Sequence, residues 1–143
     1  MIEHAETVVI HRPPHEVWAY VSRLEATPDW RTTVTSVEPP DSLVVGAAFA
    51  ATTKVLGRTW KWSMRLTEVE NGRRLGYVVT KGVVKPHVRY DLEPHEEGTR
   101  FTFTGTVGAM GTAGRLLSMV AVPTLRREIA THLGNLKRIV ESA

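Results

Sequence analysis

Cysteine is absent from the 143 residues of the chain. Its absence excludes a disulfide framework, a thiolate nucleophile and zinc sites built on thiolates, and it suits a reducing compartment. The first residues, Met1-Ile2-Glu3-His4, lack the basic start and the apolar stretch of a signal peptide. We therefore expect a cytoplasmic protein.

Long apolar runs are also scarce. One segment, residues 107–125, carries Arg115 as its only charge and approaches the roughly 20 residues that a membrane-spanning helix needs. Three glycines, Pro123 and several polar side chains interrupt its apolar character. We expect no transmembrane segment.

The positive charge of the chain is small and dispersed. The formal net charge is +3, and lysines and arginines are spread from Arg12 to Arg138, with acidic residues among them on the last helix. Nucleic-acid binding depends on a concentrated basic stripe. We therefore expect no nucleic-acid partner.

The six histidines do not form a metal motif. His11 and His15 are four residues apart, but two prolines lie between them and no HExxH frame exists. We expect these side chains to be exposed or solvated, including His87 on a polar strand face and His132 on the last helix. The sequence predicts no metal and no cofactor, and it contains no GxSxG nucleophile elbow.

Four glycines recur at every third position near the start of the last helix, at Gly105, Gly108, Gly111 and Gly114. Their spacing is not that of a phosphate-binding GxGxxG loop. We interpret them as a flexible run between the last strand and the helix, and as a lid over a cavity.

The overall composition is that of one globular domain over residues 1–143. Hydrophobic residues make up 42% and charged residues 23%, which excludes extended disorder. Residues 2–10 alternate and predict a strand. Pro13 and Pro14 then open a helix over about residues 14–24, and Thr27-Pro28-Asp29-Trp30 carries the start signals of a second, very short helix.

Residues 48–107 alternate between apolar and polar side chains, which predicts consecutive antiparallel strands. Asn71-Gly72 is a strong hairpin signal, and Pro86 indicates a bulge or an edge. The last thirty residues change to helical spacing, with a kink at Pro123. The predicted fold class is α+β: a curved antiparallel sheet of six or seven strands around a long C-terminal helix, with two short helices after the first strand.

A wide, twisted sheet is broader than one helix of about 10 Å diameter, so a cavity between them is expected. Two tryptophans and two tyrosines on the apolar face suit a binding pocket, because such rings have apolar bodies and polar tips. The candidate ligand-binding residues are Trp60, Trp62, Met64, Tyr77, Tyr90, Phe101 and Phe103 from the sheet and Leu117 and Val120 from the helix.

A specific ligand needs polar anchors as well as apolar contact. Burying about 300 Å² of apolar surface gains about 7–8 kcal/mol, whereas association costs about 4–15 kcal/mol. Tyr77 and Tyr90 are the best placed anchors on the apolar face.

The chain resembles a known superfamily over about residues 3–141. The matching pieces are Pro13-Pro14-His15-Glu16-Val17-Trp18, Pro28-Asp29-Trp30, Glu68-Val69-Glu70, Gly98-Thr99-Arg100 and Leu133-Gly134-Asn135-Leu136-Lys137. They resemble the START-like, birch-pollen-allergen-like (SRPBCC) superfamily, in its polyketide cyclase/dehydrase and lipid transport branch. The resemblance implies a helix-grip fold with its cavity between sheet and helix, and it places Trp30 near the cavity mouth. None of these pieces is a catalytic signature.

Three functions remain open. Members of the superfamily bind lipids, sterols, aromatic polyketides or hormones, which implies a carrier or sensor of a hydrophobic small molecule, as a monomer or homodimer. A polyketide aromatase/cyclase or dehydratase would need a general acid or base in the pocket, for which Tyr77, Tyr90 and Glu68 are candidates. The third is a protein-interaction module of the co-chaperone kind.

Overall fold

The computed structural model of the chain describes residues 2–81, 85–107 and 111–143, with the backbone alone at residue 2 and at 111–125. Its strands are β1 (Ile2–Ile10), β2 (Val34–Glu38), β3 (Ala48–Val55), β4 (Arg58–Glu70), β5 (Arg74–Lys81), β6 (His87–His95) and β7 (Gly98–Val107). Its helices are α1 (Pro14–Val21), a 3-10 turn (Leu24–Ala26), α2 (Thr27–Trp30) and α3 (Gly111–Ser142).

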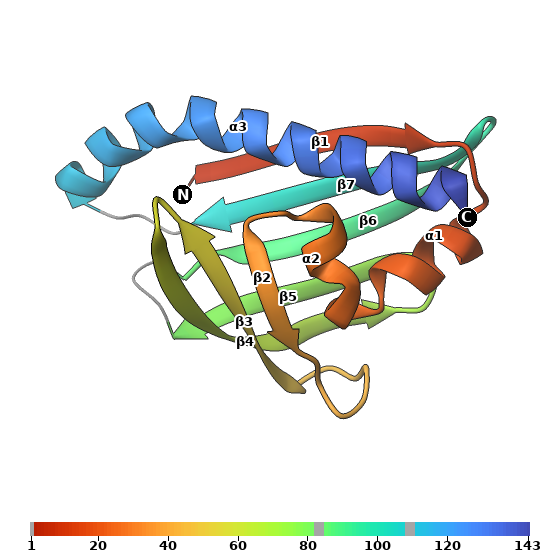
Figure 1. The fold of residues 1–143 in the computed structure, drawn as a ribbon, viewed down its shortest axis with the longest axis horizontal. Coiled ribbons are helices and arrows are strands. Elements are labelled where there is room, and N and C mark those ends of the chain that lie inside the picture. Colours follow the sequence, from red (N-terminus) through yellow and green to blue (C-terminus); the bar gives the residue numbers. More distant parts are fainter. Residues whose placement is uncertain (1, 82–84, 108–110) are drawn as a thin grey trace.

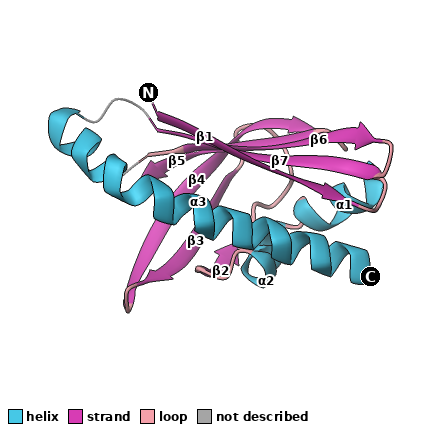
Figure 2. Ribbon diagram, turned by 90° about the horizontal axis from the view of Figure 1, so that it is seen from above, coloured by secondary structure: helices cyan, strands magenta, loops and turns pink. Residues whose placement is uncertain are grey.

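All seven strands form one antiparallel sheet in the order β1-β7-β6-β5-β4-β3-β2. Strands β2 to β7 follow one another as a meander, and β1 joins it by pairing with β7 from Ile2↔Val107 to Ile10↔Thr99. The sheet curves, and α1, α2 and α3 all lie on its concave side (Figures 1 and 2). The predicted fold class is confirmed, with seven strands.

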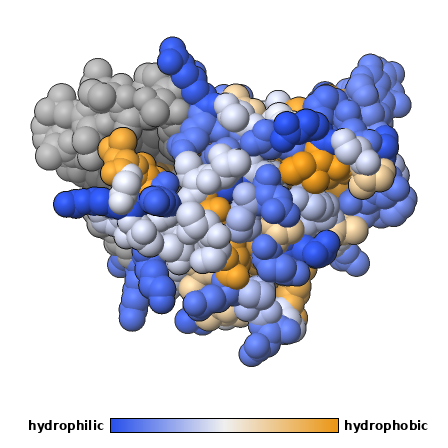
Figure 3. All heavy atoms as spheres, viewed as in Figure 1, coloured by the Kyte–Doolittle hydropathy of each residue, from blue (hydrophilic) through white to orange (hydrophobic). Residues whose placement is uncertain are grey.

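Tight turns set the register of the meander. Gly72 has φ +81° in the predicted Asn71-Gly72 turn, a conformation that costs glycine nothing. The β3–β4 hairpin turns at Leu56 and Gly57, which both have positive φ, as a two-residue turn that follows the twist of the strands requires. Leu56 is 98% exposed at this tip, and Figure 3 shows hydrophobic surface there.

The alternation predicted for the central strands is observed. Leu75, Tyr77 and Val79 are buried on β5, and the buried side chains of β6 are likewise separated by one residue. Alternate side chains of a strand point to opposite faces, so this set lines the concave face. The core is therefore built between the centre of the sheet and the helices.

The helices differ from the prediction in detail. The helix expected over residues 14–24 ends at Val21, and the chain continues through the separate 3-10 turn. The C-terminal half of α3 buries an apolar stripe that consists of Ile129, Leu133, Leu136 and Val140. This stripe packs on the concave face and on β1.

The flexible run predicted from the four glycines is wrong for three of them, which belong to regular elements. Gly105 belongs to β7, and Gly111 and Gly114 belong to α3. Residues 108–110, with Gly108, lie outside the described residues, and the lid stays a prediction. Pro86 immediately precedes β6, where its carbonyl oxygen accepts a hydrogen bond of 3.0 Å from the Val79 amide.

In the part of the chain that the structure describes, no helix is long and apolar enough to cross a membrane.

Candidate functional site

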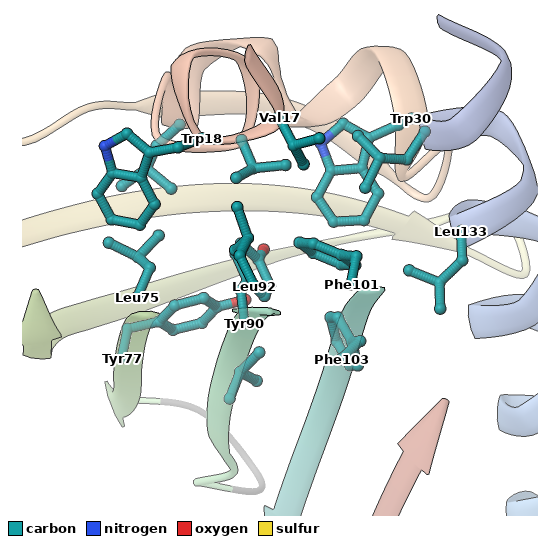
Figure 4. Packing of buried hydrophobic residues seen from close by; sticks show 14 of the residues in the cluster. Val17, Trp18, Trp30, Leu75, Tyr77, Tyr90, Leu92, Phe101, Phe103 and Leu133 are labelled. Atoms are coloured by element: carbon teal, nitrogen blue, oxygen red, sulfur yellow. The ribbon is translucent and has the colours of Figure 1, made fainter. Parts of the chain in front are cut away.

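An aromatic cluster occupies the middle of the concave face. The Trp30 ring packs edge-on against Tyr90, at 5.7 Å between ring centroids, and against Phe101, at 6.2 Å. Tyr90 in turn contacts Phe103 at 5.7 Å and Tyr77 at 6.2 Å. Figure 4 shows these rings between α2, strands β5 to β7 and Leu133 of α3. All of these pairs except the tilted Tyr90–Phe103 pair are edge-to-face, an arrangement that stabilises beyond the buried area.

A pocket of about 300 Å³ lies beside this cluster. Its described lining comes from the end of α2, from strands β2 to β6 and from α3, and most of it is apolar. The lining residues are Arg31, Thr33, Val34, Ala51, Thr53, Val55, Trp62, Met64, Tyr77, Val79, Pro86, Val88 and Glu128. The size lies at the small end of the range typical of small-molecule sites.

The Trp62 ring lines the pocket, and its indole nitrogen forms a hydrogen bond with a neighbouring strand. The indole Nε1 donates a hydrogen bond of 2.8 Å to Thr53 Oγ1 on the neighbouring strand β3. This bond fixes the orientation of the ring, so Trp62 forms a preformed apolar wall.

Arg31 brings a positive charge to this apolar surface. It follows α2 directly with φ −100° and ψ 87°, where the helix ends and the chain turns toward β2. Its Nη1 donates a hydrogen bond of 2.9 Å to the Tyr77 hydroxyl, and its guanidinium carbon lies 5.2 Å from the centroid of the Phe103 ring. The stacked ring and the phenol hold the guanidinium against the pocket wall.

The protonation states around Arg31 follow from burial and from the interactions between these side chains. Desolvation opposes the charge of Arg31, but the nearby hydroxyl oxygens of Tyr77 and Tyr90 outweigh it and raise the pKa of the guanidinium. Burial raises the pKa of the Tyr90 phenol, because it disfavours the charged phenolate. At neutral pH Arg31 is therefore a cation beside a protonated Tyr90 hydroxyl.

His132 on α3 is buried, with 4% of its surface exposed. Burial, together with the positive charge of Arg31, lowers the pKa of His132 to about 4. The expectation of exposed histidines is therefore wrong for His132, and also for His4, which is buried on β1. Because His132 is neutral at pH 7, it adds no second positive charge beside Arg31.

The predicted binding residues divide between the pocket and the cluster. Trp62, Met64 and Tyr77 line the pocket. The second group, Trp30, Tyr90, Phe101 and Phe103, is buried in the aromatic cluster. The half-buried Trp60 is not among the described lining residues, and the side chains of Leu117 and Val120 lie outside the described residues.

Glu68, a candidate acid or base, lies apart from this pocket. Its carboxylate pairs with Arg74 at 3.3 Å, and Arg74 Nε also donates to Asp91 at 2.7 Å. Asp91 in turn accepts a hydrogen bond of 2.8 Å from Arg89. This network binds strands β4, β5 and β6 together, and none of its members is among the described residues that line the pocket.

Sequence reasoning missed Arg31 and His132. An arginine directly after a short helix has the local sequence pattern of a solvated side chain. The only indication of a site at this position was its neighbour Trp30, which the resemblance placed near the cavity mouth. His132 carried a clearer signal, because it lies on the same helix face as Ile129, Leu133 and Leu136.

The fold is shared with many solved structures. The protein TTHA0849 from Thermus thermophilus matches with a TM-score of 0.81 and 19% identity, over 99% of this chain and 98% of that one. The ZhuI aromatase/cyclase from Streptomyces sp. R1128 matches with a TM-score of 0.76 and 16% identity, over 98% and 93%. At such identities the likeness shows the fold alone.

Ara h 8.0201 matches with a TM-score of 0.74 and 16% identity over 99% of both chains. No curated protein sequence matches this chain. The sequence model of one family, polyketide cyclase/dehydrase and lipid transport, matches residues 1–141. The chain therefore belongs to the polyketide cyclase/dehydrase and lipid transport family.

Proposed function

We propose that the protein binds a hydrophobic small molecule in the pocket between the sheet and α3, as a carrier or sensor. The observation that carries the proposal is the pocket of about 300 Å³, whose walls are mainly apolar and include the oriented ring of Trp62. Family membership supports it, because the family name covers both lipid transport and polyketide chemistry.

A pocket-filling substitution tests this proposal. Ala51 lines the pocket on β3, whereas its neighbour Ala50 points to the opposite face of the strand. We expect Ala51→Phe to occupy the pocket volume and to abolish binding. Ala50→Phe adds the same ring to the outer face and serves as the matched control.

The neutral fluorescent probe N-phenyl-1-naphthylamine reports on apolar sites in such an experiment. Binding by the wild type and by Ala50→Phe, with loss in Ala51→Phe, is the expected result. Equal binding by both variants would place the probe elsewhere, and it would refute the pocket as the site.

A second candidate function is polyketide aromatisation or cyclisation in the same pocket. The specific observation in its favour is the hydrogen-bonded pair of Arg31 and Tyr77 on an apolar wall, beside the Tyr90 phenol. A positioned cation and phenol can stabilise the enolate oxygen that develops when a keto group reacts. Turnover of a poly-β-keto substrate that is lost in Tyr77→Phe and in Tyr90→Phe would support an enzyme, whereas full activity in both variants would remove these residues as catalytic groups.

A further inference from the structure

Arg31 lacks an anionic partner in the described part of the chain. No carboxylate there forms an ion pair with it, although five other arginines and lysines in the described residues do have such partners. Its Nε is buried and has no hydrogen-bond partner among the described residues. A partly buried charge without a counter-ion is costly when one of its donors is shielded from water, so the retention of Arg31 calls for an explanation.

The neighbours of Arg31 hold it in place without neutralising it. Tyr77 accepts one hydrogen bond, and the Phe103 ring covers one face of the guanidinium. The pKa of His132 is lowered, so this side chain is neutral at pH 7 and adds no second positive charge beside Arg31. A guanidinium fixed in this way needs no reorganisation to receive an anion, which favours binding.

The rest of the pocket lining indicates the chemical character of a ligand whose anionic group would bind at Arg31. The rest of the described lining consists mainly of apolar side chains, among them Trp62, Met64 and Val79. Glu128 on α3 lines the same pocket, and a carboxylate there disfavours negative charge close to it. The site therefore suits one anionic group at Arg31 and an apolar body along β3, β4 and β5.

From this arrangement we propose that the physiological ligand is a hydrophobic carboxylic acid, whose carboxylate pairs with Arg31 while its apolar body lies against Trp62. This inference rests on the proposed binding function and narrows it to a chemical class. The planar guanidinium offers two parallel donors that match the two carboxylate oxygens, which a lysine ammonium does not.

Three probes with one ring system test the charge preference in the wild-type protein. They are 2-naphthoate, the neutral 2-naphthamide and the cationic 2-naphthylmethylamine, measured by calorimetry at pH 7. We expect naphthoate to bind at least about tenfold more tightly than the amide, as for one charge-assisted pair in a desolvated site. The cation should bind most weakly.

Substitutions then assign the preference to Arg31. Arg31→Met should remove the advantage of naphthoate over naphthamide, and Arg31→Lys should retain only part of it. Arg65→Met is the matched control, because Arg65 is exposed on the outer face of β4 and should leave the preference unchanged. Thermal melts establish that each variant is folded, and the comparison of probes in the wild type holds even if Arg31→Met does not fold.

The outcomes separate the inference from the proposed function. Equal binding of acid and amide, or tightest binding of the cation, would overturn the carboxylate proposal and leave a hydrophobic pocket. A naphthoate preference that survives in folded Arg31→Met would overturn it too. If none of the naphthyl probes nor N-phenyl-1-naphthylamine binds, the proposed binding function itself fails.

Discussion

Arg31 Nη1 donates a hydrogen bond of 2.9 Å to the hydroxyl of Tyr77, which joins the end of α2 to the middle of β5. The Tyr77 ring is itself held by Phe49, edge-on at 5.3 Å between centroids. The position of the Arg31 guanidinium is thus set by the packing of Tyr77 on the sheet, as well as by the short helix α2 that Arg31 follows. A substitution of Tyr77 should therefore change the position and the hydrogen bonding of the Arg31 side chain.

Tyr77→Phe should destabilise the protein by about 1–3 kcal/mol, because it removes the acceptor of a partly buried charged donor and keeps the ring. Urea denaturation measures this loss. The matched control is a double-mutant cycle with Arg31→Met, in which the same Tyr77→Phe change should cost much less. If the two substitutions are simply additive, the hydrogen bond contributes nothing to stability.

His132 should make the protein sensitive to acid. Its pKa lies near 4 in the folded chain, below its ordinary value of 6.5. Between these two values the unfolded chain takes up a proton at this side chain and the folded chain does not. The free energy of unfolding therefore decreases as the pH falls from 6.5 to 4, by up to about 3 kcal/mol from this group.

The measurement is urea denaturation at pH 7, 5.5 and 4.5 for the wild type and for His132→Gln. The substitution should flatten the pH dependence in this window, whatever it does to stability at pH 7. His15→Gln, at an exposed position on α1, is the control and should leave the slope as in the wild type. Identical slopes in all three proteins would contradict the assignment to His132.

The sequence was sufficient for the architecture because the relevant signals are local. Alternation at Leu75, Tyr77 and Val79 fixed which side of β5 is buried, and Asn71-Gly72 fixed the turn before it. Both depend on neighbours within a few residues. The same periodicity places Phe101 and Phe103 on the concave face without any knowledge of the fold.

The division between pocket and packed cluster could not be predicted in this way. Trp62 and Tyr90 both lie on the concave face, yet one lines the pocket and the other lies in the cluster beneath Trp30. What separates them is how far the sheet curves and where α2 rests on it, and both depend on contacts between distant segments. The position of the Arg31 side chain at the pocket likewise depends on contacts between distant segments, so it could not be predicted from the local sequence either.

The C-terminal end of α3 is fastened to the end of β1 by Glu141. Its carboxylate accepts hydrogen bonds from the His11 amide, at 2.9 Å, and from Lys137 Nζ, at 2.6 Å. The His11 amide and Lys137 together lower the pKa of the Glu141 carboxyl. Lys137 also donates to the Val9 carbonyl oxygen at 2.8 Å, so the contact joins strand and helix.

Glu141→Gln should cost about 1 kcal/mol in the free energy of unfolding, a modest value because the group is partly exposed to solvent. Hydrogen exchange at the His11 amide should become faster, which a general surface effect would not produce. Glu96→Gln, at an exposed turn, is the control and should change neither quantity. Unchanged exchange at His11 in Glu141→Gln would show that the contact does not hold the helix end.

Gly98 and Gly134 should respond in opposite directions to the same substitution by alanine. Gly98 begins β7 with φ +141°, and a Cβ there would lie 2.8 Å from the Arg12 nitrogen and 2.9 Å from its oxygen, and closer still to the Ile10 oxygen. These are backbone atoms, and the Arg12 oxygen already accepts a hydrogen bond of 2.7 Å from Thr99. Neither the backbone angle φ of residue 98 nor the neighbouring backbone atoms can change without strain. Gly98→Ala should therefore lower the free energy of unfolding by at least about 2 kcal/mol.

Gly134 lies within α3, and a Cβ there would meet nothing within 4 Å. Gly134→Ala should therefore stabilise the protein by about 0.5–1 kcal/mol, because alanine loses less backbone entropy on forming a helix. Thermal and urea denaturation of the two variants beside the wild type measure both effects. A mild effect of Gly98→Ala would mean that the start of β7 can move away from residues 10–12, and that this strand end is not fixed by backbone contact.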